Sequence, residues 1–282
     1  MTSGAVAATV AGAAAGAGLA WGHYEAGWVR LGTLDCPLER LPPELDGVRV
    51  AHLSDFHLGF PSRGRTAVER AVEWVRGQRP DLVLVTGDLL SRRSGESRLR
   101  ELLDGLPNCF AVLGNHDYGI SRDPFSQRSP VYDLGAATVL TDEARTVELR
   151  GRCVQVVGID PRSYRRGTAR PASLVDEDAP LRILLCHYPY VIRRLQPAAF
   201  DLVLAGHLHA GQICLPWPGR RIPLAHPRWQ DFHGLYRERA AMLHVSAGLG
   251  TTFVPFRFLA RPEATELRLR SAPGVRPSEH LD

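Results

Sequence analysis

The sequence predicts an α/β core with parallel strands, because strand patterns and helix patterns alternate along its first half. Short runs of buried β-branched and aliphatic residues occur at residues 48–53, 81–87 and 109–117. Between them, residues 65–78 and 97–106 space their apolar side chains as one face of a helix does. Strands that alternate with helices in this way are typical of βαβ units, in which consecutive strands run parallel.

The second half of the chain continues this pattern with one change. Residues 136–160 contain short alternating strands around an Arg-Gly turn, which indicates that the sheet becomes antiparallel or mixed there. Buried strands followed by loops return at residues 182–189, 200–209 and 241–250, and residues 265–270 form a last predicted strand. Residues 212–240 are rich in Pro, Trp, Arg and His without a clear period, so we expect an excursion near the functional site.

The two ends of the chain differ from this core. Residues 1–22 are an uncharged Ala/Gly-rich segment, and the length of its apolar stretch at residues 4–21 approaches the about 20 residues that a membrane-spanning helix needs. Membrane anchor, cleaved export signal and flexible tail are the alternatives, and we favour membrane association, with the side of the membrane undetermined. We expect a polar connector at residues 23–47, the folded domain at residues 48–271 and a C-terminal tail at residues 272–282.

Composition excludes several classes of protein. The net charge is only +4, and the 34 basic residues are all arginines without clustered runs, so no dedicated nucleic-acid surface is predicted. The five cysteines are widely spaced, odd in number and form no Cys-x-x-Cys pair, which argues against a disulfide framework and a zinc ribbon. Nothing in the sequence indicates an oligomeric state.

Side chains that can bind metal follow each predicted buried strand. In open α/β sheets the carboxyl ends of the strands line the ligand crevice, so these side chains are expected to converge at one edge. Their nitrogen and oxygen donors suit Mn, Fe or Zn. In chain order they are Asp55, His57, Asp88, Asn115, His116, Asp117, His187, His207 and His209.

Such a set could hold two cations. If the Asp88 carboxylate bridged them, two metals roughly 3.5–4 Å apart could share a hydroxide and clamp a phosphoryl group. Asp55 and His57 stand two residues apart, so an extended segment would point both side chains the same way, and the same applies to His207 and His209. A local zinc site of the last two histidines with Cys214 is an alternative, but it leaves the other strand ends unexplained.

Five sequence blocks carry a family resemblance. The blocks SDFHLG (54–59), GDL (87–89), GNHD (114–117), CHYP (186–189) and GHLH (206–209) resemble the motifs of the calcineurin-like metallophosphoesterases. That resemblance implies a four-layer αββα sandwich of two mixed β-sheets flanked by helices. It implies that one metal is held by Asp55, His57, Asp88 and His209. It implies that the other is held by Asp88, Asn115, His187 and His207.

The resemblance also implies roles beyond metal binding. His116 would contact the phosphate and assist departure of the leaving group, and Asp117 would support that histidine or its loop. The stretches LPPELDGVRVAHLSDFHLG, GHLHAGQICLP and GLGTTFVPFRF resemble a membrane-associated bacterial branch that includes UDP-2,3-diacylglucosamine diphosphatase-like enzymes. Leu208 and Ala210 depart from the Thr and Gly typical there. Arg257 is expected to bind a substrate phosphate, with an ordinary surface arginine as the alternative.

The predicted function is therefore a dinuclear-metal-dependent hydrolase of phosphoester or pyrophosphate bonds, in which a bridging hydroxide attacks phosphorus in line. A lipid-linked substrate is favoured by the N-terminal segment and by the tryptophans of the excursion, Trp217 and Trp229. Alternatives are hydrolysis of soluble phosphodiesters or phosphomonoesters, and a catalytically weak metal-binding scaffold. The expected location is bacterial and membrane-associated, with a cytoplasmic protein as the alternative. The substrate and the native metal are not predicted.

Overall fold

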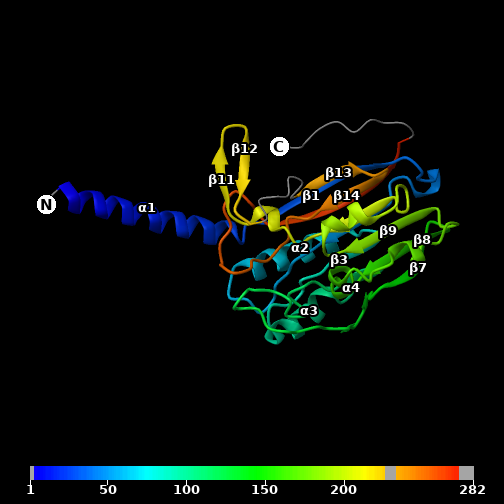
Figure 1. Cartoon of the computed structure of the whole chain (residues 1–282), viewed down its shortest axis with the longest axis horizontal. Helices are drawn as coiled ribbons and strands as arrows, with labels where there is room; N and C mark the ends of the chain where they lie inside the picture. Colours follow the sequence, from blue (N-terminus) through cyan, green and yellow to red (C-terminus); the bar gives the residue numbers. More distant parts are fainter. Residues whose placement is uncertain (1–2, 226–232, 273–282) are drawn as a thin grey trace.

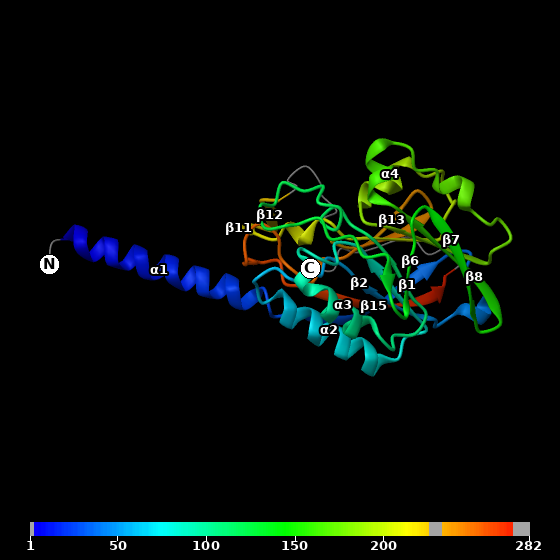
Figure 2. The same ribbon diagram turned by 90° about the horizontal axis from the view of Figure 1, so that it is seen from below.

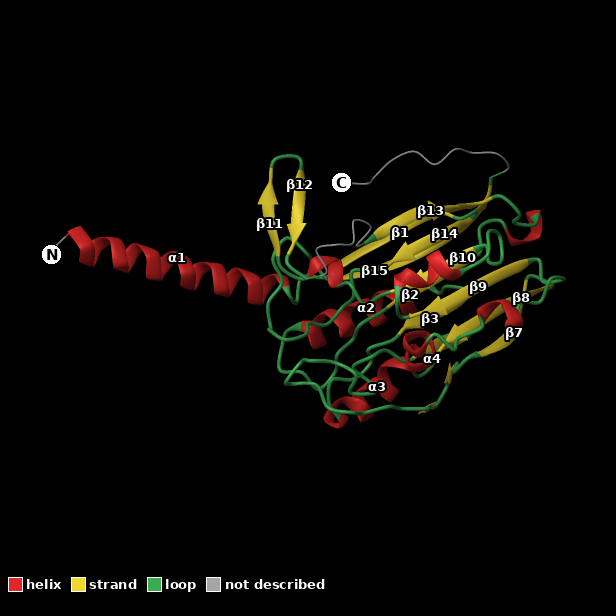
Figure 3. Ribbon diagram, viewed as in Figure 1, coloured by secondary structure: helices red, strands yellow, loops and turns green. Residues whose placement is uncertain are grey.

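The computed structural model describes residues 3–225 and 233–272, and its centre is a pair of mixed β-sheets packed face to face (Figures 1 and 3). Trp229 and nearly all of the predicted C-terminal tail lie outside the described residues.

The first sheet has seven strands in the order β1-β15-β2-β3-β4-β6-β5. Its centre is parallel from β2 to β6, whereas β15 runs antiparallel to β2. The predicted first three strands are thus confirmed as neighbours in one sheet. The bounds are β1 Arg30–Leu38, β2 Arg49–Leu53, β3 Leu82–Thr86, β4 Cys109–Val112, β5 Asp133–Leu134, β6 Ala137–Val139 and β15 Glu263–Ser271.

The second sheet has six strands in the order β13-β14-β10-β9-β8-β7. The antiparallel pair predicted within residues 136–160 is present as β7 and β8, and β8, β9, β10 and β14 then run parallel. The bounds are β7 Glu143–Leu149, β8 Arg152–Ile159, β9 Leu181–Cys186, β10 Leu202–Ala205, β13 Gly234–Glu238 and β14 Ala241–Val245.

Three apolar clusters make this a four-layer αββα sandwich, as expected. Between the sheets, side chains such as Leu84 of β3 and Ile183 of β9 form one core. On the outer face of the first sheet, the apolar stripes of α2 (Gly64–Gln78) and α3 (Glu96–Leu103) form a second core. On the outer face of the second sheet, α4 (Pro161–Arg166) and the 3₁₀ helix η4 (Pro189–Arg194) complete a third (Figure 2).

One expectation about elements is wrong, and another gains detail. The connector at residues 23–47 is not outside the domain, because it contains β1, whose nine residues pair in parallel with β15. This strand was not predicted because it contains Gly32, Asp35 and Pro37, which are unfavourable inside a sheet. An edge strand tolerates them because one of its sides needs no hydrogen-bond partner. The excursion at residues 212–240 also contains regular structure, namely the hairpin β11 (Cys214–Trp217) and β12 (Arg220–Pro223), and then β13.

The N-terminal segment forms helix α1 (Ser3–Glu25), which extends away from one end of the body (Figures 1 and 2). Residues 4–25 are long and apolar enough to cross a membrane, a test that a signal sequence also passes. No residue of its most apolar window is buried against the rest of the chain. The helix ends in contact with the folded domain, where the Gly22 carbonyl accepts a hydrogen bond from the Arg257 amide at 3.0 Å.

Candidate metal centre

The predicted ligands lie together where β2, β3, β4, β9 and β10 end. Their metal-binding atoms form two groups in which all donor atoms lie within 4.8 Å of one another, and Asp88 belongs to both. One group consists of Asp55, His57, Asp88 and His209. The other consists of Asp88, His187 and His207. All of these side chains except His207 are buried.

In the first group, imidazole nitrogens and carboxylate oxygens face one another at short range. His209 Nε2 lies 3.3 Å from Asp55 Oδ1 and 3.2 Å from His57 Nε2. His57 Nε2 lies 3.7 Å from Asp88 Oδ2. Burial lowers the pKa of His57 well below its usual value, with the His116 ring adding to that effect and the Asp88 carboxylate opposing it. A neutral imidazole is the form that ligates a metal.

In the second group, His187 is the central residue. Its Nε2 lies 3.2 Å from Asp88 Oδ2, 3.1 Å from Asn115 Oδ1 and 3.2 Å from His207 Nδ1. Asn115 is thus brought to this group, as expected. Burial acts to lower the pKa of His187, but the Asp88 and Asp55 carboxylates outweigh it and raise that pKa to about 9. A cation bound here would replace the proton that His187 Nε2 carries when the ring is charged.

The outward ring nitrogens of two histidines are held by hydrogen bonds that suit metal ligation. His187 Nδ1 lies 2.8 Å from the Thr86 carbonyl, an acceptor, so Nδ1 carries the proton and Nε2 presents its lone pair to the centre. His57 Nδ1 lies 3.1 Å from Ser91 Oγ. Such partners orient ligands and set their tautomer. The donor set and its tautomers therefore fit divalent cations.

The backbone at the site is strained. Five of the seven predicted ligands adopt left-handed conformations, with φ values of 53° at Asp55, 47° at His57, 51° at Asp88, 74° at His207 and 50° at His209. The expectation that Asp55 and His57 sit on an extended segment is therefore wrong, although both side chains reach the same group. Non-glycine residues in this region cost of order 1–3 kcal/mol each, and such residues cluster at active sites.

Two glycines allow the loops to approach the carboxylates closely. A Cβ on Gly114 would lie 2.0 Å from Asp88 Oδ1, and a Cβ on Gly206 would lie 2.3 Å from Asp55 Oδ2. Neither position has room for a side chain. The glycines of the GNHD and GHLH blocks are thus required by packing against the ligands themselves.

His116 lies beside this centre and lines a cleft. Its Nε2 is 4.0 Å from Asp88 Oδ2 and 3.1 Å from Ser121 Oγ, and its Nδ1 is 3.9 Å from Asp123 Oδ2. Nδ1 is buried without a hydrogen-bond partner among the described residues. Burial lowers the pKa of His116, and the Asp88 and Asp123 carboxylates oppose that shift.

Asp117 connects two ligand loops. Its carboxylate accepts hydrogen bonds from the backbone amides of Gly114 at 2.8 Å, Leu90 at 2.8 Å and Leu89 at 3.2 Å. Burial and the Asp88 carboxylate raise the pKa of Asp117 to about 7, and the three amides oppose that rise. Its predicted supporting role corresponds to bracing the GDL and GNHD loops.

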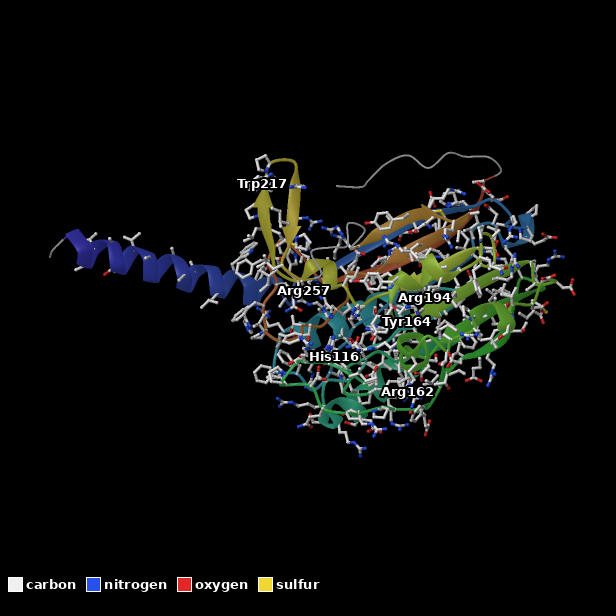
Figure 4. The ribbon with its side chains drawn as sticks, in the orientation of Figure 1. His116, Arg162, Tyr164, Arg194, Trp217 and Arg257 are labelled. Atoms are coloured by element: carbon white, nitrogen blue, oxygen red, sulfur yellow. The ribbon has the colours of Figure 1, made fainter. Side chains whose placement is uncertain are left out.

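Arg257 does not lie where a substrate phosphate could reach it, so that expectation is corrected. The side chain is fully buried, and its guanidinium donates to the carbonyls of Gly250, Ala247 and Ala260 at 2.6–3.1 Å. Nη2 also lies 3.3 Å from His209 Nδ1. In Figure 4, Arg257 is labelled between His116 and the end of α1. The arginine braces the loops behind His209.

The two departures from the family pattern are packing residues. Leu208 is fully buried in the cluster on the outer face of the second sheet. Ala210 adopts φ 50° and ψ 31°, a left-handed conformation that glycine would accept at lower cost, and packs with Cys214, Ala247 and Ala260. Cys214 Sγ donates to the Ala210 carbonyl at 3.3 Å, and no cysteine joins a metal-binding group among the described residues.

Sequence reasoning missed the polar residues that hold the ligands. Ser54 Oγ donates to Asp55 Oδ2 at 2.6 Å and accepts from Thr86 Oγ1 at 2.7 Å. Ser91 orients His57, and Asp123 faces His116. The only sequence signal for Ser54 is its place beside Asp55, and Ser91 and Asp123 carry none, because their partners come from other loops.

A cleft of about 880 Å³ opens at the centre. Asp88, Asn115, His116, His207 and His209 form its floor. The walls are largely apolar and aromatic, and include Ile120, Tyr164, Tyr188, Ile213, Leu224 and Phe253. Arg122 and Arg165 also line it.

Comparison with known proteins places this site in a family. Residues 48–211, which contain all seven predicted ligands, match the profile of the calcineurin-like phosphoesterases. The chain belongs to that family. This metallophosphoesterase has a buried Asp/His site with two clusters consistent with a dinuclear metal centre.

Three relatives cover most of this metallophosphoesterase. It is 28% identical over 244 residues to the uncharacterized metallophosphoesterase YkoQ of Bacillus subtilis, covering 84% of this chain and 89% of that protein. It is 26% identical over 300 residues to the UDP-2,3-diacylglucosamine pyrophosphatase LpxG of Chlamydia trachomatis, covering 87% and 91%. It is 27% identical over 272 residues to the phosphodiesterase YaeI of Escherichia coli, covering 93% and 96%.

Proposed function

We propose that this metallophosphoesterase is a bacterial, membrane-associated enzyme that hydrolyses a phosphodiester or pyrophosphate bond in a lipid-linked substrate. The observation that carries the proposal is the cleft, in which a polar floor of Asp, Asn and His meets largely apolar walls. An amphiphile with a phosphate at one end and an apolar body at the other complements such a surface. Two of the relatives are named as enzymes for such bonds.

The metal ligands are proposed to be the seven residues Asp55, His57, Asp88, Asn115, His187, His207 and His209. Two divalent cations bound there would act as Lewis acids that polarise the phosphoryl group, and they would lower the pKa of an attacking water. Mn, Fe and Zn are all compatible with these oxygen and nitrogen donors. The shared position of Asp88, buried and in both groups, supports a bridging role.

The protein's own contribution to catalysis centres on His116. Its ring lines the cleft beside Asp88, and its buried Nδ1 lacks a hydrogen-bond partner among the described residues. We propose that the other ring nitrogen, Nε2, which faces Asp88 Oδ2 at 4.0 Å, donates to a phosphoryl oxygen or to the leaving oxygen as negative charge develops there. Asp123, 3.9 Å from Nδ1, would stabilise the protonated ring, and Asp88 Oδ1 positions the residue by accepting from its backbone amide at 2.8 Å.

A soluble phosphodiester is the second candidate substrate. The observation that favours it is the pair of arginines at the cleft, Arg122 and Arg165, which could bind a second phosphate of a small molecule. A catalytically weak scaffold is disfavoured by the presence of His116 and Asn115 in the cleft.

Hydrolysis assays test the proposal. The purified full chain with Mn²⁺ should cleave bis(p-nitrophenyl) phosphate, and Asp88→Asn should reduce kcat/KM by at least about 10³-fold, because both groups lose their shared carboxylate. Metal content measured on the same samples should fall with activity. A metal-loaded protein without activity on diesters, pyrophosphates or lipid-linked forms would refute the function. Higher kcat/KM on soluble diesters than on lipid-linked ones would favour the second candidate.

A further inference from the structure

Exposed hydrophobic side chains gather at the end of the molecule from which α1 extends. Among the described residues, eleven of the fourteen exposed large hydrophobic side chains lie in three segments. These segments are α1 with the turn after it, the β11–β12 hairpin with Leu224, and the loop at residues 253–259. Beyond Val6, Val10 and Leu19 of α1, they contribute Trp21, Tyr24, Trp28, Leu215, Trp217, Leu224, Phe253 and Leu259.

Direct contacts join the three segments into one surface. The Phe258 ring packs on Gly22, where an added Cβ would lie 2.3 Å from the ring. The Ala260 amide donates to Glu25 Oε1 at 2.7 Å, which fixes the loop to the end of α1. The Cys214 amide donates to the Phe258 carbonyl at 2.9 Å, which fixes the hairpin to the same loop. Figures 1 and 3 accordingly show β11 and β12 standing beside the end of α1 and across its direction.

The charges on this surface are basic. Arg63 lies over the Tyr24 ring at 5.7 Å and Arg261 over the Trp28 ring at 3.7 Å. Arg220 and Arg221 lie on the hairpin itself. Residues 213–225 and 251–262 contain no acidic residue, and Glu25 is buried against the Ala260 amide and the Trp21 indole. Aromatic rings mixed with arginines are typical of the membrane–water interface, and the positive charge complements anionic lipid.

We propose that the β11–β12 hairpin and the loop at residues 253–259 form a second membrane-contacting element that lies on an anionic bilayer surface beside α1. This inference rests on the membrane anchoring in the proposed function. If α1 spans the bilayer, the surface at its C-terminal end faces the headgroups, which makes a bilayer, and not another protein, the occupant that the fold places there. The hairpin would add contact area that the single helix does not provide.

The same segments form one wall of the metal-centre cleft. Ile213 precedes β11, Leu224 follows β12, and Phe253 begins the loop, and all three line the cleft. Contact of the hairpin with the bilayer would therefore turn the cleft toward the headgroup layer. The phosphate of a lipid could reach Asp88 and His116 while its acyl chains remained in the membrane.

Fluorescence quenching by brominated lipid tests this contact without relying on activity. The full chain is placed in nanodiscs of equal parts phosphatidylcholine and phosphatidylglycerol, with the phosphatidylcholine either brominated or not. The emission of Trp217, which is 57% exposed at the tip of the hairpin, is obtained as the difference between the chain and Trp217→Phe (Figure 4). We expect bromine to quench roughly half or more of it. Trp74, packed on α2 against the core, is the matched control, and the Trp74→Phe difference should not be quenched.

The possible results separate the parts of the proposal. Quenching of Trp217 without quenching of Trp74 supports the hairpin contact, even if no hydrolysis is found. A chain that enters the nanodiscs with Trp217 unquenched overturns the hairpin contact and leaves the enzyme function standing. A chain that does not enter nanodiscs overturns both the contact and the anchoring by α1. If Trp217 is not quenched and the chain forms a dimer that Leu215→Ser abolishes, the surface binds a second copy of the chain. That result would overturn the lipid contact.

Discussion

Replacement of Arg257 by methionine should destabilise the protein without weakening substrate binding. The guanidinium is the buried donor for the carbonyls of Gly250, Ala247 and Ala260, at distances of 2.6–3.1 Å. Burial lowers the pKa of Arg257 to about 10, so the side chain remains charged at neutral pH. Methionine removes the charge and leaves these three buried carbonyls, and the more distant His209 carbonyl at 3.3 Å, without this donor.

The magnitude follows from the cost of those carbonyls. A buried acceptor that loses its partner costs about 1–3 kcal/mol, and water entering the vacated space recovers part of that. We therefore expect the free energy of unfolding to fall by about 3–5 kcal/mol, a large share of the about 5–15 kcal/mol typical of a domain. Arg257→Lys keeps the charge but cannot reach all three carbonyls. Its free energy of unfolding should therefore fall, but by less than that of Arg257→Met.

Urea denaturation of the full chain in mild detergent measures this change, and steady-state kinetics on bis(p-nitrophenyl) phosphate measures KM. Arg122→Met is the control, since that arginine is exposed at the cleft, and its stability should change by no more than about 0.5 kcal/mol. The folded Arg257→Lys protein should keep KM within about twofold. An Arg257 variant of normal stability whose KM rises about tenfold would refute the bracing role. It would support the original prediction that Arg257 binds a substrate phosphate.

Two further predictions concern catalysis and stability. His116→Ala should lower kcat by about 10²–10⁴-fold at unchanged metal content, because the backbone bond to Asp88 remains while the ring that lines the cleft is lost; kinetics with metal analysis checks this, and full activity would contradict the role. Ala240→Gly should stabilise the protein by about 0.5–1 kcal/mol in urea denaturation, because Arg239 and Ala240 form a two-residue turn with φ values of 53° and 61°. Ala172→Gly, at an exposed position outside the left-handed region, should lose stability, and equal effects of the two changes would contradict the explanation.

Strand ends were readable from sequence because a buried strand leaves a strong local signal. The apolar runs that became β2, β3, β4, β9 and β10 end just before the predicted ligands, so strand order alone placed Asp55, Asp88, Asn115 and His187 near one edge. The edge strand β1 was missed for the opposite reason. Its burial depends on β15, more than 200 residues away, and its own residues include Gly32, Asp35 and Pro37.

The sequence by itself predicted the α/β core and the convergence of the candidate ligands, since buried runs and the polar residues that follow them are local properties of the chain, whereas the four-layer sandwich was implied by the family resemblance. Only the tertiary structure decided the residues whose role depends on a distant partner. Arg257, expected to bind a substrate phosphate, is instead buried, and the carbonyls of Gly250, Ala247, Ala260 and His209 surround it. Ser91 and Asp123 became neighbours of the site through loops that no local pattern predicts. The position of the β11–β12 hairpin beside the end of α1 likewise depends on the contacts of Phe258, because burial and the charges around a residue are set by the folded structure and not by the order of residues in the sequence.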